Sequence, residues 1–347
     1  MTIFLLPEVD CDRRTFMRGA AASCLVVAAP AHAAPREDII EAARREEGLL
    51  WYDHYDRDAI EQVLAAFRKK YPFVKKTEFV SVPSAQKTAR IIQESTAGGP
   101  TTDILLNDPA IVKLLRDRGF VLDTESAALG VAPSLAPTPY LVSALTPPYV
   151  ILYNTSLVKD DEIPRTWEDA VDAKWKGRTG HWMRAAAFVN LSSMVGDVKA
   201  RELLEKLAAL KPRLFEGLFP LSQAVGSGEI AMAITAYDSA IRIVEKGAPV
   251  KIASMEPTAM GMISGAVMKF GKNPSTARLF IAWLASSEGA IAFENATKRG
   301  NAFVEGTQTA KLLQGRKLAF HTAEQSIANS KQNNALEVEF SRKLAGR

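Results

Sequence analysis

The chain from Gly48 onward alternates short apolar runs with stretches in which apolar residues recur every three or four positions. The run "GLLWY" at 48–52 predicts a β-strand, and the apolar spacing over 60–67 predicts an amphipathic helix directly after it. Asp58 precedes that helical stripe, and Glu61 follows Asp58 by three residues, which is typical of a capping box at the start of a helix. The pattern therefore predicts a strand that turns sharply into a helix.

The same alternation recurs further along the chain. Strands are expected at 76–82 and 102–106, and helices are expected to begin at Ser84 and at Pro109, with Asp108 directly before the second of them. Short strands that alternate with helices are typical of an α/β fold in which mainly parallel strands are flanked by helices.

Two segments indicate that the chain passes between two lobes. Residues 123–148 are rich in Pro, Ala and Ser, which separates the first group of elements from a strand candidate at 149–158. A return is expected near 254–268, before a strongly helical stretch at 273–293. The expected division is lobe one at 34–145 plus 257–347, and lobe two at 146–256.

The segment 1–33 has the layout of an export signal. The pair Arg13–Arg14 precedes an apolar run at 19–29 and a small-residue exit that ends at Ala33. It resembles a twin-arginine signal, with Asp12 where that pattern carries Ser or Thr. The apolar run is shorter than the roughly 20 residues that span a bilayer. We therefore expect cleavage near Ala33 and a periplasmic protein.

Composition and charge exclude several classes of protein. Apolar residues make up 47% of the chain and charged residues 24%, as in globular proteins. The 43 basic and 39 acidic residues are interspersed, without the basic block of a nucleic-acid arm. Both cysteines, Cys11 and Cys24, lie in the expected signal, so no thiol chemistry is expected after cleavage. The sequence has no hydrolase elbow, phosphate loop or zinc pattern, so we assign no catalytic residue and expect no enzyme.

Aromatic hydroxyl and imidazole groups collect at the ends of the predicted strands. In open α/β sheets the ligand crevice lies beyond the carboxyl ends of the strands, so these groups are candidate ligand-binding residues. Phenolate and imidazole also bind hard cations such as ferric iron, whereas a lone Tyr at a strand end is commonly a packed aromatic. Both interpretations stay open for the candidates His54, Tyr55, Tyr149, Tyr153, His181, Trp182 and Tyr237.

Several longer motifs resemble one family of transport proteins. The segments "YVILYNTSLV", "IPRTWEDAVDAKWKGRTG", "AVGSGEIAMAITAYDSA" and "NPSTARLFIAWLASSEGA" are similar to segments of ABC-transporter solute-binding proteins of the type 2 periplasmic class, and within it of the ferric-ion-binding branch. The resemblance covers nearly the whole chain after residue 33. It implies a two-lobed fold, a solute held between the lobes, and a membrane permease with its ATPase as partners. The chain carries no coiled-coil or dimer stripe and no basic block, so we also expect a monomer that binds no nucleic acid.

The resemblance also implies a set of residues that coordinate a metal ion. Residues His54, Tyr55, Tyr153 and Tyr237 stand where iron-binding relatives carry ligands, together with a synergistic anion, and no other cofactor is implied. Ala236 replaces the first of two consecutive tyrosines. The arginine that helps to hold the anion in those relatives is replaced in this sequence, and Arg184 is a candidate substitute.

The same residues fit other solutes. Neutral tyrosines with Trp182 and Arg184 would bind an organic anion or a phosphonate, and a polyamine or a sugar stays open. Outside transport, the same fold would serve a secreted enzyme or a ligand sensor.

Overall fold

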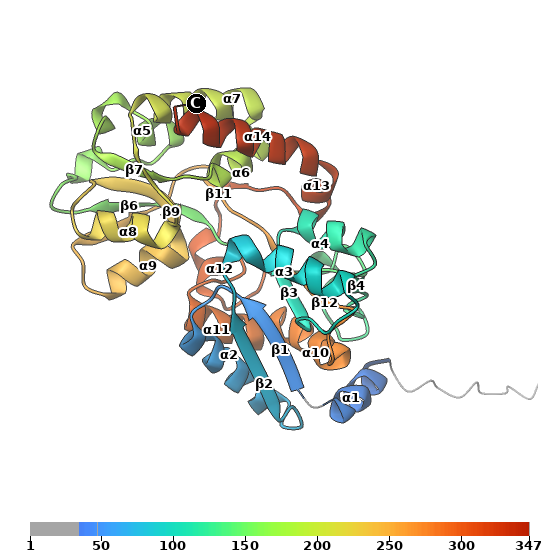
Figure 1. Ribbon diagram of the computed structural model, residues 1–347. Helices are drawn as coiled ribbons and strands as arrows, with labels where there is room; N and C mark the ends of the chain where they lie inside the picture. Colours follow the sequence, from blue (N-terminus) through green and yellow to red (C-terminus); the bar gives the residue numbers. More distant parts are fainter. Residues whose placement is uncertain (1–34, 47, 347) are drawn as a thin grey trace, which may run out of the picture.

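The computed structural model describes residues 35–46 and 48–346. The chain forms two α/β lobes, each built on one β-sheet with helices on both faces (Figure 1). The expected α/β fold is confirmed, and the expected export signal at 1–33 lies outside the described residues. No helix in the described part of the chain is long and apolar enough to cross a bilayer.

The first sheet has the order β2-β1-β3-β12-β4, with β5 also paired to β12. Strand β1 runs parallel to β2 and β3, whereas β12 runs antiparallel to β3, β4 and β5. The sheet is therefore mixed rather than mainly parallel, because β12 enters it from the second lobe and not through a strand-helix-strand unit. The strands are β1 (Gly48–Asp53), β2 (Lys76–Ser81), β3 (Ile104–Asn107), β4 (Val121–Leu122), β5 (Val142–Leu145) and β12 (Ile263–Met268).

Helices cover both faces of this sheet. One apolar core lies under α2, α10 and α11 and contains Trp51, and the other lies under α3, α4 and α13 and contains Leu105. The periodic stretch at 273–293 divides into two helices, because Ser286 caps the second of them. The helices are α1 (Pro35–Arg45), α2 (Arg57–Lys70), α3 (Ser84–Thr96), α4 (Pro109–Asp117), α10 (Pro274–Leu284), α11 (Ser287–Thr297), α12 (Gln308–Leu313) and α13 (Ala323–Ala328).

The start of α2 differs from the expectation. Asp56, not Asp58, is the N-cap, and its side chain accepts a hydrogen bond from the Ala59 backbone N–H at 3.1 Å. Asp58 lies in the first turn, where its negative charge favours the positive end of the helix. The capping box predicted at Asp58 is therefore wrong by two residues, because β1 ends at Asp53 and leaves a short turn.

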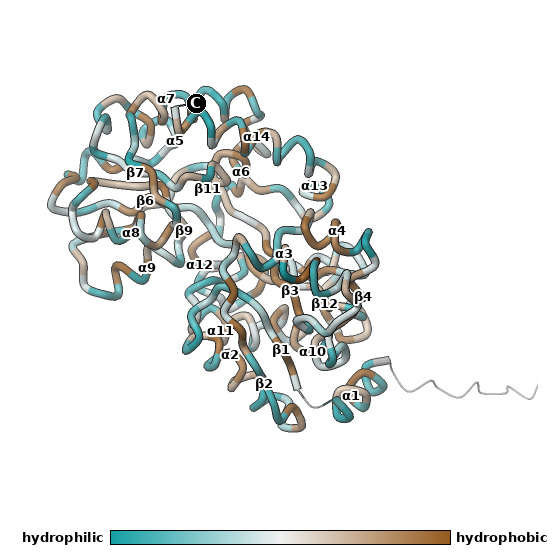
Figure 2. Tube along the Cα trace, in the orientation of Figure 1, coloured by the Kyte–Doolittle hydropathy of each residue, from teal (hydrophilic) through white to brown (hydrophobic). Residues whose placement is uncertain are grey.

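The second sheet has the order β10-β6-β9-β7-β8. Strand β6 is antiparallel to β9 and β10, and β7 is parallel to β8 and β9. Figure 2 shows apolar residues along strands such as β3 and β6, inside helices of mixed hydropathy. The strands are β6 (Tyr149–Asn154), β7 (Thr179–Trp182), β8 (Arg213–Phe215), β9 (Met232–Ala236) and β10 (Val250–Ala253).

Helices of the second lobe include one from the C-terminal part of the chain. Helix α14 packs against α6 and α7 and adds Leu336, Phe340 and Leu344 to the core on that face. Helices α8 and α9 cover the other face. The helices are α5 (Trp167–Ala170), α6 (Ala186–Val195), α7 (Asp197–Ala209), α8 (Leu218–Gly226), α9 (Tyr237–Glu245) and α14 (Ser330–Leu344).

The segments that connect the lobes lie side by side. One joins β5 to β6 and another joins β10 to β12, and the Gly261 N–H donates to the Pro147 carbonyl at 2.9 Å where they meet. Short strands β11 (Thr258–Ala259) and β13 (Leu318–Ala319) pair in parallel beside them. The chain passes between the lobes once more between α13, which packs on α4, and α14. The expected lobe boundaries stay a prediction, and the packing of α14 favours a boundary near residue 329.

Candidate functional site

A cleft of about 450 Å³ lies between the two lobes and is lined by residues of both. On the first lobe it lies beyond the carboxyl ends of the parallel strands β1 and β3, at Asp53 and Asn107. On the second lobe it lies at the beginning of β6 and the end of β7. The carboxyl ends of parallel strands are where side chains from different strands converge, so this is the expected place for a ligand.

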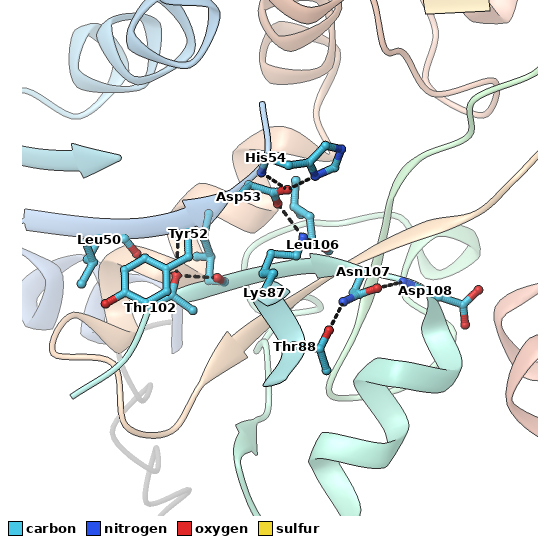
Figure 3. A network of polar contacts seen from close by, with 11 residues as sticks. Leu50, Tyr52, Asp53, His54, Lys87, Thr88, Thr102, Leu106, Asn107 and Asp108 are labelled. Carbon is cyan, nitrogen blue, oxygen red and sulfur yellow. Dashed lines mark hydrogen bonds and ion pairs between the residues drawn. The ribbon is translucent and has the colours of Figure 1, made fainter. Parts of the chain in front are cut away.

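A buried carboxylate organises the first wall of the cleft. Asp53 is fully buried at the end of β1, where one oxygen contacts His54 Nδ1 at 2.7 Å and the other accepts from Lys87 Nζ at 2.9 Å (Figure 3). Burial alone raises the pKa of Asp53, but the hydrogen bond with His54 and the charge of Lys87 outweigh it, so the pKa is lowered. The carboxylate stays ionised and fixes both neighbours.

Lys87 of α3 reaches this wall from beneath. Its ammonium group also donates to the Leu106 carbonyl at 2.8 Å, and only 5% of its side chain is exposed. An ammonium group has three N–H donors, and these two contacts use two of them. Lys87 also lines the cleft.

The end of β3 supplies a second group of polar side chains. Asn107 donates to the Thr88 hydroxyl at 3.1 Å and accepts from the Asp108 backbone N–H at 2.9 Å (Figure 3). Asp108 is the N-cap of α4, as the sequence predicted, and accepts from the Ala110 N–H at 2.8 Å. Asn107 and Asp108 thus line the cleft in fixed orientations.

The opposite wall carries aromatic groups and a cation. The guanidinium carbon of Arg184 lies 5.1 Å from the ring centroid of Trp182, and Arg184 Nε donates to Glu337 of α14 at 2.6 Å. Tyr149 also lines this wall, and burial raises the pKa of its phenol. At neutral pH Tyr149 is therefore a neutral hydrogen-bonding group beside a fixed guanidinium.

Tyr55 and Arg299 line the cleft beside His54. The Tyr55 ring stacks on His54, with centroids 5.0 Å apart, and the guanidinium carbon of Arg299 lies 5.0 Å from the Tyr55 centroid. Burial raises the pKa of Tyr55, and the charge of Arg299 opposes this only in part. Tyr55 is therefore a neutral phenol in this arrangement.

Comparison with known proteins agrees with a cleft built for a solute. A model of the bacterial extracellular solute-binding proteins matches residues 62–319. The chain belongs to this family. Its members include the substrate-binding components of ABC importers, and the chain is a solute-binding protein of this kind.

Individual relatives of this solute-binding protein are distant. It is 21% identical over 261 residues to the Fe(3+)-binding periplasmic protein of Serratia marcescens, which is 72% of this chain and 77% of the relative. Iron-bound HitA from Pseudomonas aeruginosa has a TM-score of 0.70 at 19% identity, over 85% of this chain and 99% of that one. AfuA from Actinobacillus pleuropneumoniae, with exogenous fructose-6-phosphate bound, has a TM-score of 0.68 at 19% identity, over 86% of this chain and 99% of AfuA. These likenesses show the two-lobed fold.

Five of the eight residues predicted from the sequence line the cleft of the solute-binding protein. The structure brings together His54, Tyr55, Tyr149, Trp182 and Arg184. Their role in binding the solute stays a prediction.

The other three predicted residues lie outside the lining of this cleft. Tyr153 follows Tyr149 by four positions on β6, at the far end of the strand, and packs in the second-lobe core. His181 is 2% exposed and its Nδ1 contacts the Trp182 carbonyl at 2.6 Å, because successive residues of β7 face opposite sides of the sheet. Tyr237 begins α9 and packs against the core beneath α8.

Only two of the four metal ligands that the resemblance implied are therefore found at the cleft. His54 and Tyr55 lie together at the cleft, whereas Tyr153 and Tyr237 do not line it. In the part of the chain that the structure describes, no group of three or more His, Cys, Asp or Glu side chains could hold a metal ion. The metal ligands His54, Tyr55, Tyr153 and Tyr237 stay a prediction.

Sequence reasoning missed Lys87, Glu337 and Arg299. Lys87 lies within an amphipathic helical pattern, where a lysine is normally solvated, and only its proximity to Asp53 gives it a role. Glu337 and Arg299 come from segments far along the chain that carry no local motif. The signal that could have located Lys87 is its place in the first turns of a helix that follows a strand.

Proposed function

We propose that this solute-binding protein captures a small organic anion, a carboxylate or a phosphonate, and delivers it to the permease of an ABC importer. The observation that carries the proposal is the lining of the cleft, which includes Tyr149, Trp182 and Arg184 but neither Tyr153 nor Tyr237. A guanidinium beside an aromatic face suits an anion with a flat or apolar body. Neutral phenols suit hydrogen bonds to that anion.

The charges of the cleft support an anionic ligand because Asp53, Asp108 and Glu337 each already accept at least one hydrogen bond. Both oxygens of Asp53 have partners, Glu337 accepts from Arg184, and Asp108 caps α4. In residues 35–46 and 48–346 Arg184 has one hydrogen-bond partner, so its terminal amino groups are available. Lys87 and Arg184 lie on opposite walls of the cleft, so their remaining N–H donors would serve an anion bound between the lobes.

Two helix N-termini at the cleft also favour an anionic ligand. Helix α3 begins at Ser84 and helix α6 begins at Ala186, both of which line the cleft, and neither helix has a side-chain N-cap. The first backbone N–H groups of a helix have no partner within the helix, and the helix dipole favours negative charge at this end. Both ends thus support binding of an anion between the lobes.

Other features of the proposal follow from the family. Capture from outside the cytoplasm requires export, for which the segment 1–33 is the candidate signal, and we place the protein in the periplasm. Its partners would be the inner-membrane permease with its ATPase. We propose that it acts as a monomer and releases the solute chemically unchanged.

Binding can be tested by thermal shift and calorimetry with carboxylates, phosphonates and sugar phosphates as separate probes. We expect at least one anion to raise the melting temperature, and we expect Arg184→Gln to weaken its binding by roughly tenfold or more, as expected for a charged hydrogen-bonding partner. Arg201→Gln is the matched control, because Arg201 pairs with Glu339 of α14 at 2.7 Å but lies outside the cleft. Equal binding by both variants would contradict the proposal.

Ferric iron is the second candidate, and a specific observation favours it. The Serratia marcescens protein is named for Fe(3+) binding and HitA is iron-bound. In addition, His54 Nδ1 contacts a buried carboxylate, an arrangement that also orients metal-binding histidines. Titration with chelated ferric iron, with and without bicarbonate or citrate, would then give a visible charge-transfer band that Tyr55→Phe and Tyr237→Phe reduce. If no band appears while an organic anion raises the melting temperature, iron is excluded as the solute.

A further inference from the structure

Three polar contacts join α9 of the second lobe to residues 297–299, which comprise the last residue of α11 in the first lobe and the two residues after it. Arg299 Nε contacts Asp238 Oδ2 at 2.9 Å, Arg242 donates to the Thr297 carbonyl at 2.9 Å, and Lys298 contacts Glu245 at 2.8 Å. The α9 residues at 238, 242 and 245 are spaced so that they share one face of the helix. We call this set of contacts the α9 clasp.

The clasp connects two separate hydrophobic cores. Helix α9 packs on the second sheet through Ala240 and Ile243, whereas α11 packs in the first-lobe core through Ala290 and Phe293. Lys298 has a left-handed backbone, with φ of 65°, which ends α11 and turns the chain toward α9. A rotation of one lobe against the other must therefore stretch or break these contacts.

The clasp also adjoins the segments that connect the lobes. The Tyr237 N–H, at the beginning of α9, donates to the Pro148 carbonyl at 2.9 Å. On the other side, the Thr146 N–H donates to the Gly300 carbonyl at 3.0 Å. Both ends of the clasp are thus fixed to the same connecting segment, so bending there changes the geometry of the clasp.

Arg299 differs from the other clasp residues because it reaches the cleft. Its guanidinium lies over Tyr55, and both residues line the cleft. The Asp238 side chain is only 6% exposed, and its second oxygen has no hydrogen-bond partner among the described residues. Loss of Arg299 would leave a buried, unpaired carboxylate, which is strongly unfavourable. In contrast, Glu245 is 48% exposed, so its pair with Lys298 is screened by water.

We propose that Arg299 is a positioning residue that couples the binding cleft to lobe closure: its pair with Asp238 holds the lobes in their relative orientation while its guanidinium holds Tyr55 in the cleft wall. This inference goes beyond the choice of solute, since it rests on contacts between the lobes that are the same for an anion and for iron. Its consequence is that weakening the pair changes the distribution of lobe orientations before any ligand is added.

The test measures the distance between the lobes in ligand-free protein. Spin labels on cysteines at Asp117 of α4 and Glu202 of α7 would report it by double electron–electron resonance, because both side chains are exposed and lie on different lobes. The full chain carries Cys11→Ser and Cys24→Ser so that only the introduced cysteines react. We expect one narrow distribution in the parent protein, and a broader distribution shifted to other distances in Asp238→Asn.

Controls separate positioning from a general loss of structure. Glu245→Gln removes the exposed pair and should leave the distribution unchanged, and Arg299→Lys should restore much of the narrow distribution that Arg299→Gln loses. Asp238→Asn combined with Arg299→Gln should broaden the distribution no more than either change alone, since both remove one interaction. If Arg299→Gln does not fold, Asp238→Asn and Arg299→Lys still decide the question. A parent-like distribution in a folded Asp238→Asn variant, or additive effects in the double variant, would overturn the proposal.

Discussion

Single residues of the second lobe show how burial changes the chemistry of a polar side chain. His181 lies in the core beside Phe188, its Nδ1 contacts the Trp182 carbonyl, and its Nε2 has no partner within the described residues. Water cannot stabilise a positive charge there. Burial lowers the pKa of His181 from 6.5 to about 4, and the hydrogen bond with Trp182 opposes this only in part.

This lowered pKa predicts a loss of stability in acid. The unfolded chain binds the proton more readily than the folded protein, so the contribution of neutral His181 is fully present above pH 6.5 and is lost as the pH falls toward 4. The loss amounts to roughly 3 kcal/mol of unfolding free energy at pH 4. Urea denaturation between pH 4 and pH 7 measures it.

His181→Asn is the matched variant for this prediction. The asparagine side chain can still donate to the Trp182 carbonyl, but it does not titrate. We expect the variant to lose clearly less stability between pH 7 and pH 4 than the parent protein, while His54 and His321 remain in both. Parallel profiles of unfolding free energy against pH for the two proteins would show that protonation of His181 does not cause the loss of stability in acid.

At the scale of elements, α14 is the clearest example of packing that local sequence does not reveal. The helix lies at the C-terminal end of the described chain but completes the core beside α7, and its polar face supplies Glu337 to the cleft. One helix therefore both stabilises the second lobe and orients Arg184. A substitution on its apolar face should affect stability, whereas one on its exposed face should not.

Phe340→Ala tests the role of α14. Phe340 is fully buried, and replacing a buried Phe with Ala removes apolar contact area and leaves a cavity, so we expect a loss of about 3–5 kcal/mol in unfolding free energy. Val338→Ala, on the same helix at 51% exposure, should change stability by less than about 0.5 kcal/mol. Urea denaturation of both variants measures the difference, and a small loss in Phe340→Ala would mean that α14 is not part of the cooperative core.

At the scale of the whole molecule, two cores joined by neighbouring segments allow the lobes to bend relative to each other. The cleft lies between the cores. A solute that contacts both walls therefore stabilises the lobe orientation that brings the two walls together. We expect the permease to distinguish loaded from unloaded protein by this difference in shape.

Closure predicts a measurable change in overall dimensions. When an anion found by thermal shift is added at saturation, we expect the radius of gyration from small-angle X-ray scattering to fall. Arg184→Gln at the same anion concentration should show a smaller fall, because less of the variant is occupied. An unchanged radius for the parent protein, with occupancy verified by calorimetry, would contradict closure.

The sequence by itself determined most of the elements of the first lobe and one part of the cleft. Helix starts at Ser84 and Pro109 and the strand that begins at Gly48 follow from local periodicity, proline placement and capping, and these are properties of neighbouring residues. His54 and Tyr55 could be placed at the site for the same reason, since they directly follow a strand. Even so, the N-cap of α2 is Asp56 and not the expected Asp58, because the exact end of β1 depends on its pairing with β2.

Only the tertiary structure decided which side chains line the cleft. Lys87 meets Asp53 across 34 positions of sequence, and Arg184 meets Glu337 across 153, so no local pattern could pair them. The same holds for the residues that the structure turns away from the cleft. Tyr153 and His181 occupy strand positions that look suitable in the sequence, but the pleat of β7 and the length of β6 place them in the core. Local sequence determines where a strand begins and ends, whereas the packing of the lobes determines which of its faces meets the cleft.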